Sequence, residues 1–315
     1  MPSELLAGVD VGGTKILGVI VDRADPTQVL AEHKVPTPHG AEAVLGAIMD
    51  VVKALDDGSV QSLGVGIAGL VDRNGVLRVG PNLPQMHDTP VLESLAGRLD
   101  IPVAVDNDAT CAAWGEHLAG AARGFADIIL VTLGTGIGAG IVDAGGIDHG
   151  AHGFAGEAGH MVVDPTGPLC PCGRRGCWER MASGSGLGRL ARDAAEAGRL
   201  GRALELAHDD LMAVRGEHVA LAAAEGDAEA RELLRSFAWW VAMGLANLVT
   251  LLDPGVVVIG GGLVEIGDPL IDPTREHYRN LVMAQDQRPD VEIVAAQLGE
   301  RAGAIGAALL HRQRA

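Results

Sequence analysis

Two glycine-rich segments carry residue types that bind phosphate. Residues 10–15 are DVGGTK and residues 133–138 are LGTGIG. Glycine lets backbone N–H groups come close to phosphate oxygens, and a threonine hydroxyl adds a donor. Asp10 is expected to position Mg²⁺, and Lys15 to offset phosphate charge. Either segment alone is explained as well by a tight turn. Their matched positions, with a third glycine turn at 260–262, favour phosphate binding.

A cysteine cluster predicts a metal site. Cys170, Cys172 and Cys177 lie within eight residues, and His160 is the nearest upstream histidine. Three thiolates and one imidazole form a closed tetrahedral set, which is typical of structural zinc. The alternative is a group of free thiols. Cys111 lies in an expected helix and is assigned no chemistry.

Acidic residues near these segments suggest proton transfer. Asp108 follows an expected strand, so its carboxylate could take the proton of a hydroxyl nucleophile, with Asn107 bonding to that nucleophile's neighbours. The alternative, common for Asp and Asn at such a place, is that the pair caps a helix. If His160 binds zinc through one ring nitrogen, the other can donate to a substrate hydroxyl. Glu157 and Glu179, taken singly, are more often surface charges.

The elements around these residues follow from hydrophobic periodicity. Residues 5–22 predict a β-hairpin with a glycine turn, and a third strand is expected near 29–35. Apolar residues recur at helical spacing over 43–55. Strands are expected at 62–68 and 103–106, with a helix starting after Asp108.

The pattern then restarts, which suggests an internal duplication. Residues 128–143 match the first hairpin at a constant offset, as at positions 13 and 134. A buried helix (237–252), a strand (256–259) and a short helix (302–310) are expected later. The helix is shorter than a membrane span. Two duplicated domains predict a ligand cleft between them.

Other phosphate and dinucleotide motifs do not fit. The chain has no Walker-type loop. Residues 64–69 and 134–139 match a dinucleotide fingerprint, but the first is expected to be a strand and the second lies in a hairpin, whereas that fingerprint opens a helix. A dehydrogenase is therefore a remote alternative.

Composition limits the class of protein. The 315 residues carry a net charge of −17, which argues against nucleic acid and anionic membranes as partners. Hydrophobic residues make up 48%, as in ordinary globular chains, while aromatics are only 3%, so a bound sugar would be recognised mainly by hydrogen bonds. The first residues do not resemble a signal peptide, so a cytoplasmic protein is expected.

Together these residues resemble the ROK family of sugar kinases and repressors, within the actin-like ATPase superfamily. The resemblance extends over nearly the whole chain, and its most specific part is the pattern C-x-C-G-x-x-G-C-x-E. The motifs that carry it lie at residues 10–15, 64–69, 81–83, 107–116, 133–140, 157–160, 170–179 and 259–263.

The resemblance implies an α/β fold of two ribonuclease-H-like domains, 1–108 (joined by the C-terminal helix, 301–315) and 109–300. It implies ATP-dependent phosphorylation of glucose at the 6-hydroxyl, with Asp108 as general base, in a homodimer or homotetramer. The implied sugar ligands are Gly69, Asn82, Asn107, Asp108, Glu157, His160 and Glu179. The ATP ligands, with Mg²⁺, are Asp10, Gly12, Gly13, Thr14, Lys15, Thr135, Gly136, Gly261 and Gly262. The structural zinc ligands are His160, Cys170, Cys172 and Cys177.

Rival functions remain at this point. Another sugar, such as fructose, mannose, N-acetylglucosamine or N-acetylmannosamine, is not separated from glucose, and polyphosphate could replace ATP. A sugar sensor without turnover is a second class, although a sensor needs no base at Asp108. A repressor is not expected, because the phosphate motif begins at Asp10 and leaves no room for a helix-turn-helix before it.

Overall fold

The computed structural model describes residues 4–56 and 58–311 and confirms the predicted α/β class. Two five-stranded sheets have the orders β3-β2-β1-β4-β8 and β11-β10-β9-β12-β13, and a third sheet has the order β5-β6-β7. Both large sheets therefore begin with a hairpin and continue in the same order. This repeated topology agrees with the predicted duplication.

The described residues form two compact units. Unit 1 contains residues 4–56, 58–130, 139–156 and 294–311, and unit 2 contains residues 131–138 and 157–293. The predicted division into domains at 108/109 stays a prediction.

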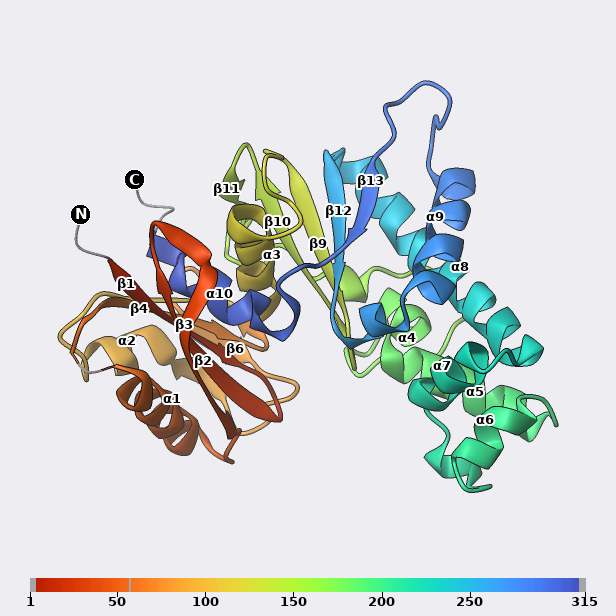
Figure 1. The fold of residues 1–315 in the computed structure, drawn as a ribbon, viewed down its shortest axis with the longest axis horizontal. Coiled ribbons are helices and arrows are strands. Elements are labelled where there is room, and N and C mark those ends of the chain that lie inside the picture. The colour runs from red at the N-terminus through yellow and green to blue at the C-terminus, as the bar shows by residue number, and fades with distance from the viewer. Residues whose placement is uncertain (1–3, 57, 312–315) are drawn as a thin grey trace. The chain divides into compact units, whose positions relative to one another are not determined.

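The first sheet lies wholly in unit 1 and confirms the first predicted hairpin. Strand β1 pairs antiparallel with β2 and parallel with β4, which itself pairs parallel with β8. Helices α1 and α2 lie on one face of this sheet (Figure 1). The strands are β1 (Leu5–Val11), β2 (Lys15–Asp22), β3 (Asp25–Pro36), β4 (Val60–Ile67) and β8 (Val103–Asn107), and the helices of this unit are α1 (Ala41–Leu55), α2 (Val91–Ala96), α3 (Asp108–Ala119), η4 (Gly299–Arg301) and α10 (Ala302–Ala308).

Strand β1 separates two environments. Ala7, Val9 and Val11 are buried in the core shared with α1. The alternate residues, Gly8 and Asp10, face α10, because successive side chains of a strand point to opposite faces. The sheet thus directs one carboxylate away from the apolar core.

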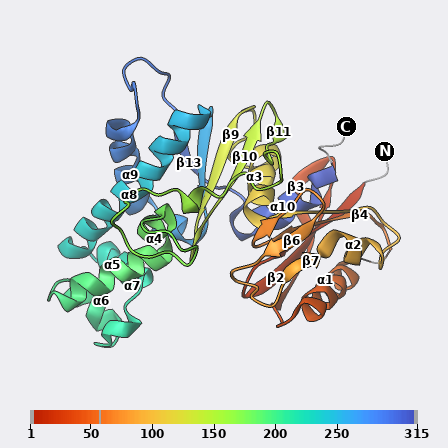
Figure 2. The same ribbon diagram turned by 180° about the vertical axis from the view of Figure 1, so that it is seen from behind.

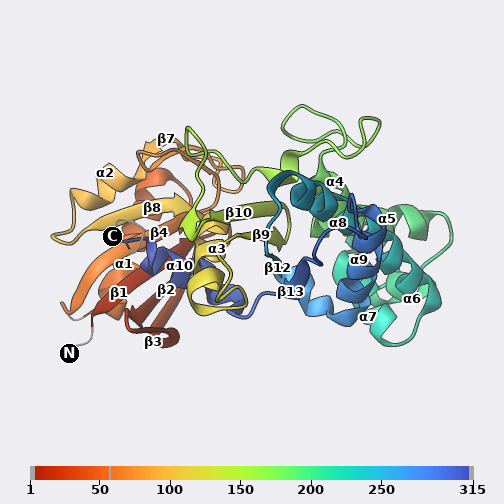
Figure 3. The ribbon, with the colours of Figure 1, turned by 90° about the horizontal axis from the view of Figure 1, so that it is seen from above.

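Helix α10 is fixed beside β1, β4 and α3, as Figure 3 shows. The Glu116 carboxylate, fully buried in α3, accepts hydrogen bonds from the N–H groups of Gln297 and Leu298. The Trp114 indole donates to the Leu309 carbonyl at 3.0 Å. These contacts hold the segment that enters and leaves α10.

The remaining strands belong to the other two sheets. Strand β4 includes most of the G-x-G-x-x-G match at 64–69 and is followed by another strand, so this match lacks the helix that a dinucleotide fingerprint requires. The other strands are β5 (Leu70–Val71), β6 (Val76–Val79), β7 (His87–Pro90), β9 (Ile128–Leu133), β10 (Ile137–Asp143), β11 (Gly146–Ile147), β12 (Val256–Gly260) and β13 (Glu292–Ala295).

Helix α8 is the core of the helical part of unit 2 (Figure 2). It begins nine residues before the predicted start at 237 and is the one helix among the described residues that is long and apolar enough to cross a membrane. However, 56% of its most apolar window is buried, as in a core helix. The helices here are η1 (Ala158–His160), α4 (Trp178–Ala182), α5 (Gly184–Glu196), α6 (Gly201–Leu206), η2 (Leu211–Ala213), α7 (Gly216–Ala224), α8 (Ala228–Leu252), η3 (Gly262–Ile266) and α9 (Asp268–Leu281).

Candidate functional site

The first glycine turn, residues 12–14, joins β1 to β2 in unit 1. Two of its carbonyls accept hydrogen bonds from one residue: the Thr37 hydroxyl donates to Gly12 O at 2.7 Å, and the Thr37 N–H donates to Thr14 O at 3.1 Å. The N–H groups of Gly13 and Thr14 donate to no residue that the structure describes. Two backbone donors at a turn are what an anion requires.

Asp10 precedes this turn and faces α10. A Cβ on Gly303 would lie 2.9 Å from the Asp10 Cγ, so only glycine leaves room for the carboxylate. Burial, which is the main cause, and the nearby Asp108 carboxylate together raise the pKa of Asp10 to about 7, although Lys15 opposes the shift. Two neighbouring carboxylates that disfavour each other's charge fit a hard divalent cation, which would neutralise both.

Lys15 is already paired. Its ammonium donates to Glu300, which also accepts from Lys34 at 3.0 Å. Hydrogen bonds from the two lysines lower the pKa of Glu300 to about 2. A role for Lys15 at phosphate therefore requires exchange of this partner and stays a prediction.

Asp108 is the first residue of α3, directly after β8. Asn107 caps the helix, since its side-chain oxygen accepts from Thr110 N at 3.0 Å. Its amide nitrogen donates to Gly69 O at 3.0 Å and to Asp108 Oδ1 at 2.9 Å. The helix-cap alternative is therefore right for Asn107, which also orients the neighbouring carboxylate. Its predicted contact with sugar stays untested.

Burial raises the pKa of the Asp108 carboxyl, while the backbone N–H groups at Ala109 and Asp108 and the Asn107 amide oppose the shift. A carboxylate that is held in place and more basic than usual has the properties of a general base. Unit 1 thus brings Asp10, Asn107, Asp108 and Gly69 together.

Asn82, the other predicted sugar ligand in unit 1, lies against the first glycine turn. A Cβ on Gly13 would come within 2.7 Å of the Asn82 Cβ. The Asn82 side chain is exposed, so its amide remains accessible.

One further ion pair, formed by His149 and Asp106, was not predicted from the sequence. His149 Nε2 lies 2.6 Å from Asp106 Oδ2, and this hydrogen bond raises the pKa of His149. Both residues border a cavity of about 290 Å³ in unit 1. No periodicity links residues so far apart in the chain; the position of Asp106 at a strand end was the one available signal.

The second glycine turn, residues 134–136, joins β9 to β10 in unit 2. Gly134 O accepts from Gly184 N at 2.7 Å, and Thr135 O accepts from the Ser185 hydroxyl at 2.8 Å. The N–H groups of Thr135 and Gly136 have no acceptor in the described part of the chain. This turn therefore offers the same kind of donor pair as the first.

Glu179 lies at this second turn. Its Oε2 accepts from Ile137 N at 3.0 Å, and a side chain on Gly136 would collide with the same carboxylate. The sequence predicted Glu179 as a sugar ligand, a role that stays untested. The structure adds a contact with the turn that the sequence did not indicate.

The other predicted ligands in unit 2 lie in, or directly before, short 3₁₀ segments. Glu157 precedes η1, in which His160 is the last residue. Gly261, at φ 83°, lies so close to the Leu133 backbone that no Cβ fits. Gly262 opens η3 and is exposed.

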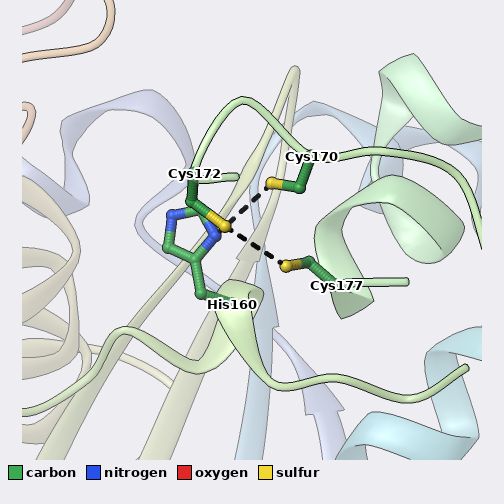
Figure 4. Close-up of side chains that lie close together, drawn as sticks. All are labelled: His160, Cys170, Cys172 and Cys177. Atoms are coloured by element: carbon green, nitrogen blue, oxygen red, sulfur yellow. Dashed lines mark hydrogen bonds between the residues drawn. The ribbon is translucent and has the colours of Figure 1, made fainter. Parts of the chain in front are cut away.

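The predicted metal ligands come together in unit 2. The ligand atoms of His160, Cys170, Cys172 and Cys177 all lie within 4.8 Å of one another, and their side chains converge on a common centre (Figure 4). Cys172 Sγ lies 3.5 Å from Cys177 Sγ, and Cys170 Sγ lies 3.7 Å from His160 Nδ1. Ligands about 2.3 Å from a tetrahedral zinc are separated by roughly 3.7 Å. The donor set and its spacing therefore fit zinc.

The surroundings favour a thiolate at Cys172, whereas burial raises the pKa of the neighbouring Cys177 thiol to about 12. The N–H of Arg174 is the main cause that lowers the pKa of the Cys172 thiol, to about 6. Cys111, by contrast, is fully buried in α3, and burial raises the pKa of its thiol. The prediction that Cys111 belongs to the core is confirmed.

Comparison with known proteins gives consistent matches over the full length. The sequence model of the ROK family matches residues 6–314. The chain is 40% identical over 313 residues to a glucokinase of Streptomyces coelicolor, covering 98% of each protein. It is 30% identical over 306 residues to an N-acetylmannosamine kinase of Salmonella typhi, covering 96% of each. A solved ROK family glucokinase from Streptomyces griseus, in complex with glucose and AMPPNP, matches with a TM-score of 0.87 and 40% identity, covering 98% of this chain and 99% of that one.

Proposed function

The chain belongs to the ROK family, and on that premise we propose that it is an ATP-dependent glucokinase. The observation that carries the proposal is the Asp108 carboxylate, which Asn107 orients at the start of α3 and which burial makes more basic. The full-length similarity to a glucokinase supports glucose as the acceptor.

In the proposed reaction the glucose 6-hydroxyl oxygen attacks the γ-phosphorus of ATP. The new O–P bond forms as the bond from the γ-phosphorus to the β,γ-bridging oxygen breaks, and ADP leaves. Asp108 accepts the hydroxyl proton and later releases it to solvent. Phosphoryl transfer depends mainly on such positioning and on charge stabilisation.

Asp10 is the residue that would hold Mg²⁺, either directly or through water. When bound, Mg²⁺ would offset the charge of the phosphates. Asp10 itself is fixed on β1, and Gly303 leaves space for its carboxylate. The N–H groups of Gly13 and Thr14 would bind phosphate oxygens, and those of Thr135 and Gly136 would do the same.

Structural zinc would be held by His160, Cys170, Cys172 and Cys177. When bound, it would fix the segment from His160 to Cys177 and leave the second nitrogen of His160 free for a sugar hydroxyl. The sugar ligands remain those that the sequence predicts, namely Gly69, Asn82, Asn107, Asp108, Glu157, His160 and Glu179. A cytoplasmic homodimer or homotetramer, with domains 1–108 and 109–300, completes the proposal.

A kinase for N-acetylmannosamine is the second candidate, because a relative with that name is 30% identical over most of both chains. The two sugars differ at C2, so discrimination requires few contacts. A non-catalytic sensor is disfavoured, since a sensor does not need a buried carboxylate at Asp108.

An ADP-release assay with Mg-ATP tests the proposal against glucose, mannose, fructose, the two N-acetylhexosamines and a blank without sugar. We expect strong turnover with glucose and little with the others. Strong turnover only with N-acetylmannosamine would select the second candidate. Absence of turnover with every sugar would contradict the kinase, and polyphosphate as donor would then be examined.

The substitution Asp108→Asn tests the base. Loss of a general base lowers kcat by about 10²–10⁴-fold. We expect that loss without a fall in the temperature of thermal unfolding, because asparagine retains the size and the Oδ1 acceptor for Asn107 and carries no charge to be buried. Asp100→Asn, an exposed change near the start of β8, is the control and should be neutral. Near-normal turnover of Asp108→Asn would refute the assignment.

A further inference from the structure

The second glycine turn is held from the side of its carbonyls. Gly134 O and Thr135 O accept from two consecutive residues of α5, Gly184 through its N–H at 2.7 Å and Ser185 through its hydroxyl at 2.8 Å. Gly136 O accepts from Gly134 N at 3.0 Å. All the carbonyls of the turn are thus occupied.

Helix α5 can make these contacts because its own cap is provided separately. Ser183 is the N-cap residue, and its hydroxyl accepts from Gly186 N at 3.1 Å. Gly184 approaches so closely that a Cβ would lie 2.9 Å from Gly134 O. Ser185 is therefore not needed to start the helix, and its hydroxyl is available for the turn.

The hydrogen bond to the Thr135 carbonyl also affects the N–H groups on the opposite side of the turn. A peptide unit whose carbonyl is held by a donor has its plane fixed, since the peptide is rigid. The Thr135 carbonyl shares its peptide plane with the Gly136 N–H. The bond from Ser185 therefore fixes the direction of a donor that has no acceptor in the described part of the chain.

We propose that Ser185 is a positioning residue for nucleotide binding, which orients the Gly136 N–H toward the phosphates of ATP through the Thr135 carbonyl. This inference rests on the proposed kinase function and adds a residue that no motif indicated. The start of the 13-residue helix α5 also carries partial positive charge, which favours an anion nearby.

A purely structural role for Ser185 does not explain its contacts. The residue is exposed, whereas Ser183 beside it is fully buried. Its side chain makes one hydrogen bond within the described residues, and that bond ends on the turn. Removal of the hydroxyl should therefore affect the turn and leave the core unchanged.

The test compares Ser185→Ala with Ser185→Thr, which retains a hydroxyl, in the full-length zinc-loaded protein. Loss of one hydrogen bond predicts an approximately five-fold increase in KM for ATP, with kcat and the KM for glucose nearly unchanged. Calorimetric titration with AMPPNP should show the same weakening without turnover. Threonine should restore most of the affinity. Ser236→Ala, an exposed change on α8, is the control.

The outcomes separate this inference from the proposed function. If the unmodified protein binds AMPPNP and Ser185→Ala binds it equally well, the positioning role is wrong. If Ser185→Ala raises the KM for glucose as much as the KM for ATP, the residue stabilises the general structure of the protein. The positioning role is then also wrong. If the unmodified protein binds no nucleotide, the kinase proposal itself fails.

Discussion

The turn after β1 and the turn after β9 occupy matched positions in the duplicated sequence, but their charges differ. Asp10 and Lys15 flank the first turn, and Asp108 raises the pKa of Asp10. The matched residues at the second turn are Val131 and Gly136, which carry no charge. Both turns therefore offer backbone donors, but the first is flanked by its own side chains for cation and proton chemistry, whereas the second has the Glu179 carboxylate against it from outside the hairpin.

Both turns are held by hydroxyl groups from elements outside the duplicated hairpins. Thr37 follows β3 and donates to Gly12 O, while Ser185 belongs to α5 and donates to Thr135 O. Two unrelated segments thus donate hydrogen bonds to carbonyls of the turns. The N–H groups of the turns remain available to a ligand. A duplicated turn does not require a duplicated support.

Among the substitutions that compare the two turns, the largest expected effect comes from Asp10→Asn, which removes charge from the first turn. We expect kcat to fall by about 10²-fold or more, since a cation ligand and its charge stabilisation are lost. The apparent Mg²⁺ requirement should rise as well. The ADP-release assay over a Mg²⁺ series measures both, and Asp50→Asn, an exposed change on α1, is the control.

The same substitution should stabilise the metal-free protein at high pH. The pKa of Asp10 is about 7 in the folded chain and 3.8 as a reference, so the folded state retains a proton between these values that the unfolded state has lost. Stability therefore falls as pH rises through this window, and asparagine removes that loss, roughly 2–4 kcal/mol. Urea unfolding in EDTA at pH 5 and pH 8 measures the free energy of unfolding of the variant and of the unmodified protein. If the two proteins differ by the same free energy at both pH values, the raised pKa is wrong.

Zinc should matter mainly to the second turn, because Glu179 lies two residues after Cys177 and contacts Ile137 N. Cys172→Ser is expected to lose bound zinc, to lower the Tm by about 5 °C or more, and to weaken sugar binding through His160. Metal analysis and thermal unfolding measure these effects. Cys111→Ala removes a thiol elsewhere and should retain zinc; full zinc in Cys172→Ser would refute the site.

Glu179 allows the turn contact to be separated from the predicted sugar contact. Glu179→Ala should raise the KM for ATP about ten-fold, because a hydrogen bond to a charged group is lost at the turn. Glu179→Gln retains an acceptor for Ile137 N and should recover most of the ATP affinity. Steady-state kinetics with each substrate varied gives both constants. If Glu179→Ala changes only the KM for glucose, the contact between Glu179 and Ile137 N does not contribute to ATP binding.

The two glycine turns and the cysteine cluster could be predicted from the sequence. Glycine spacing predicted both hairpins, and the cysteine pattern predicted the ligands that converge in unit 2. These features depend on local backbone geometry and on residues close together in the chain. The start of α8 was placed too late, because its first turns are polar and lack the apolar run at 237–252.

Contacts between distant segments could not be predicted. The bond from Ser185 to Thr135 joins residues 50 positions apart, and the pair of His149 and Asp106 joins residues 43 apart. Such pairs depend on how elements pack, which leaves no periodic trace in one sequence. Even within a motif, the role of Asn107 could not be decided from the sequence, which left a helix cap and a ligand as alternatives. In the structure, the Asn107 amide caps α3 and also orients Asp108.

The smallest effect tests the support of the first turn. Thr37→Val keeps the shape of the side chain but removes the 2.7 Å bond to Gly12 O, so the KM for ATP should rise by about three- to five-fold. The Thr37 N–H bond to Thr14 O remains, which limits the loss. Thr250→Val removes a hydroxyl bond of equal length inside α8 and should be neutral. Combined with Ser185→Ala, the effects should multiply, because the two hydroxyls hold separate turns and share no partner. A double variant no worse than either single one would show that the turns do not bind the nucleotide independently.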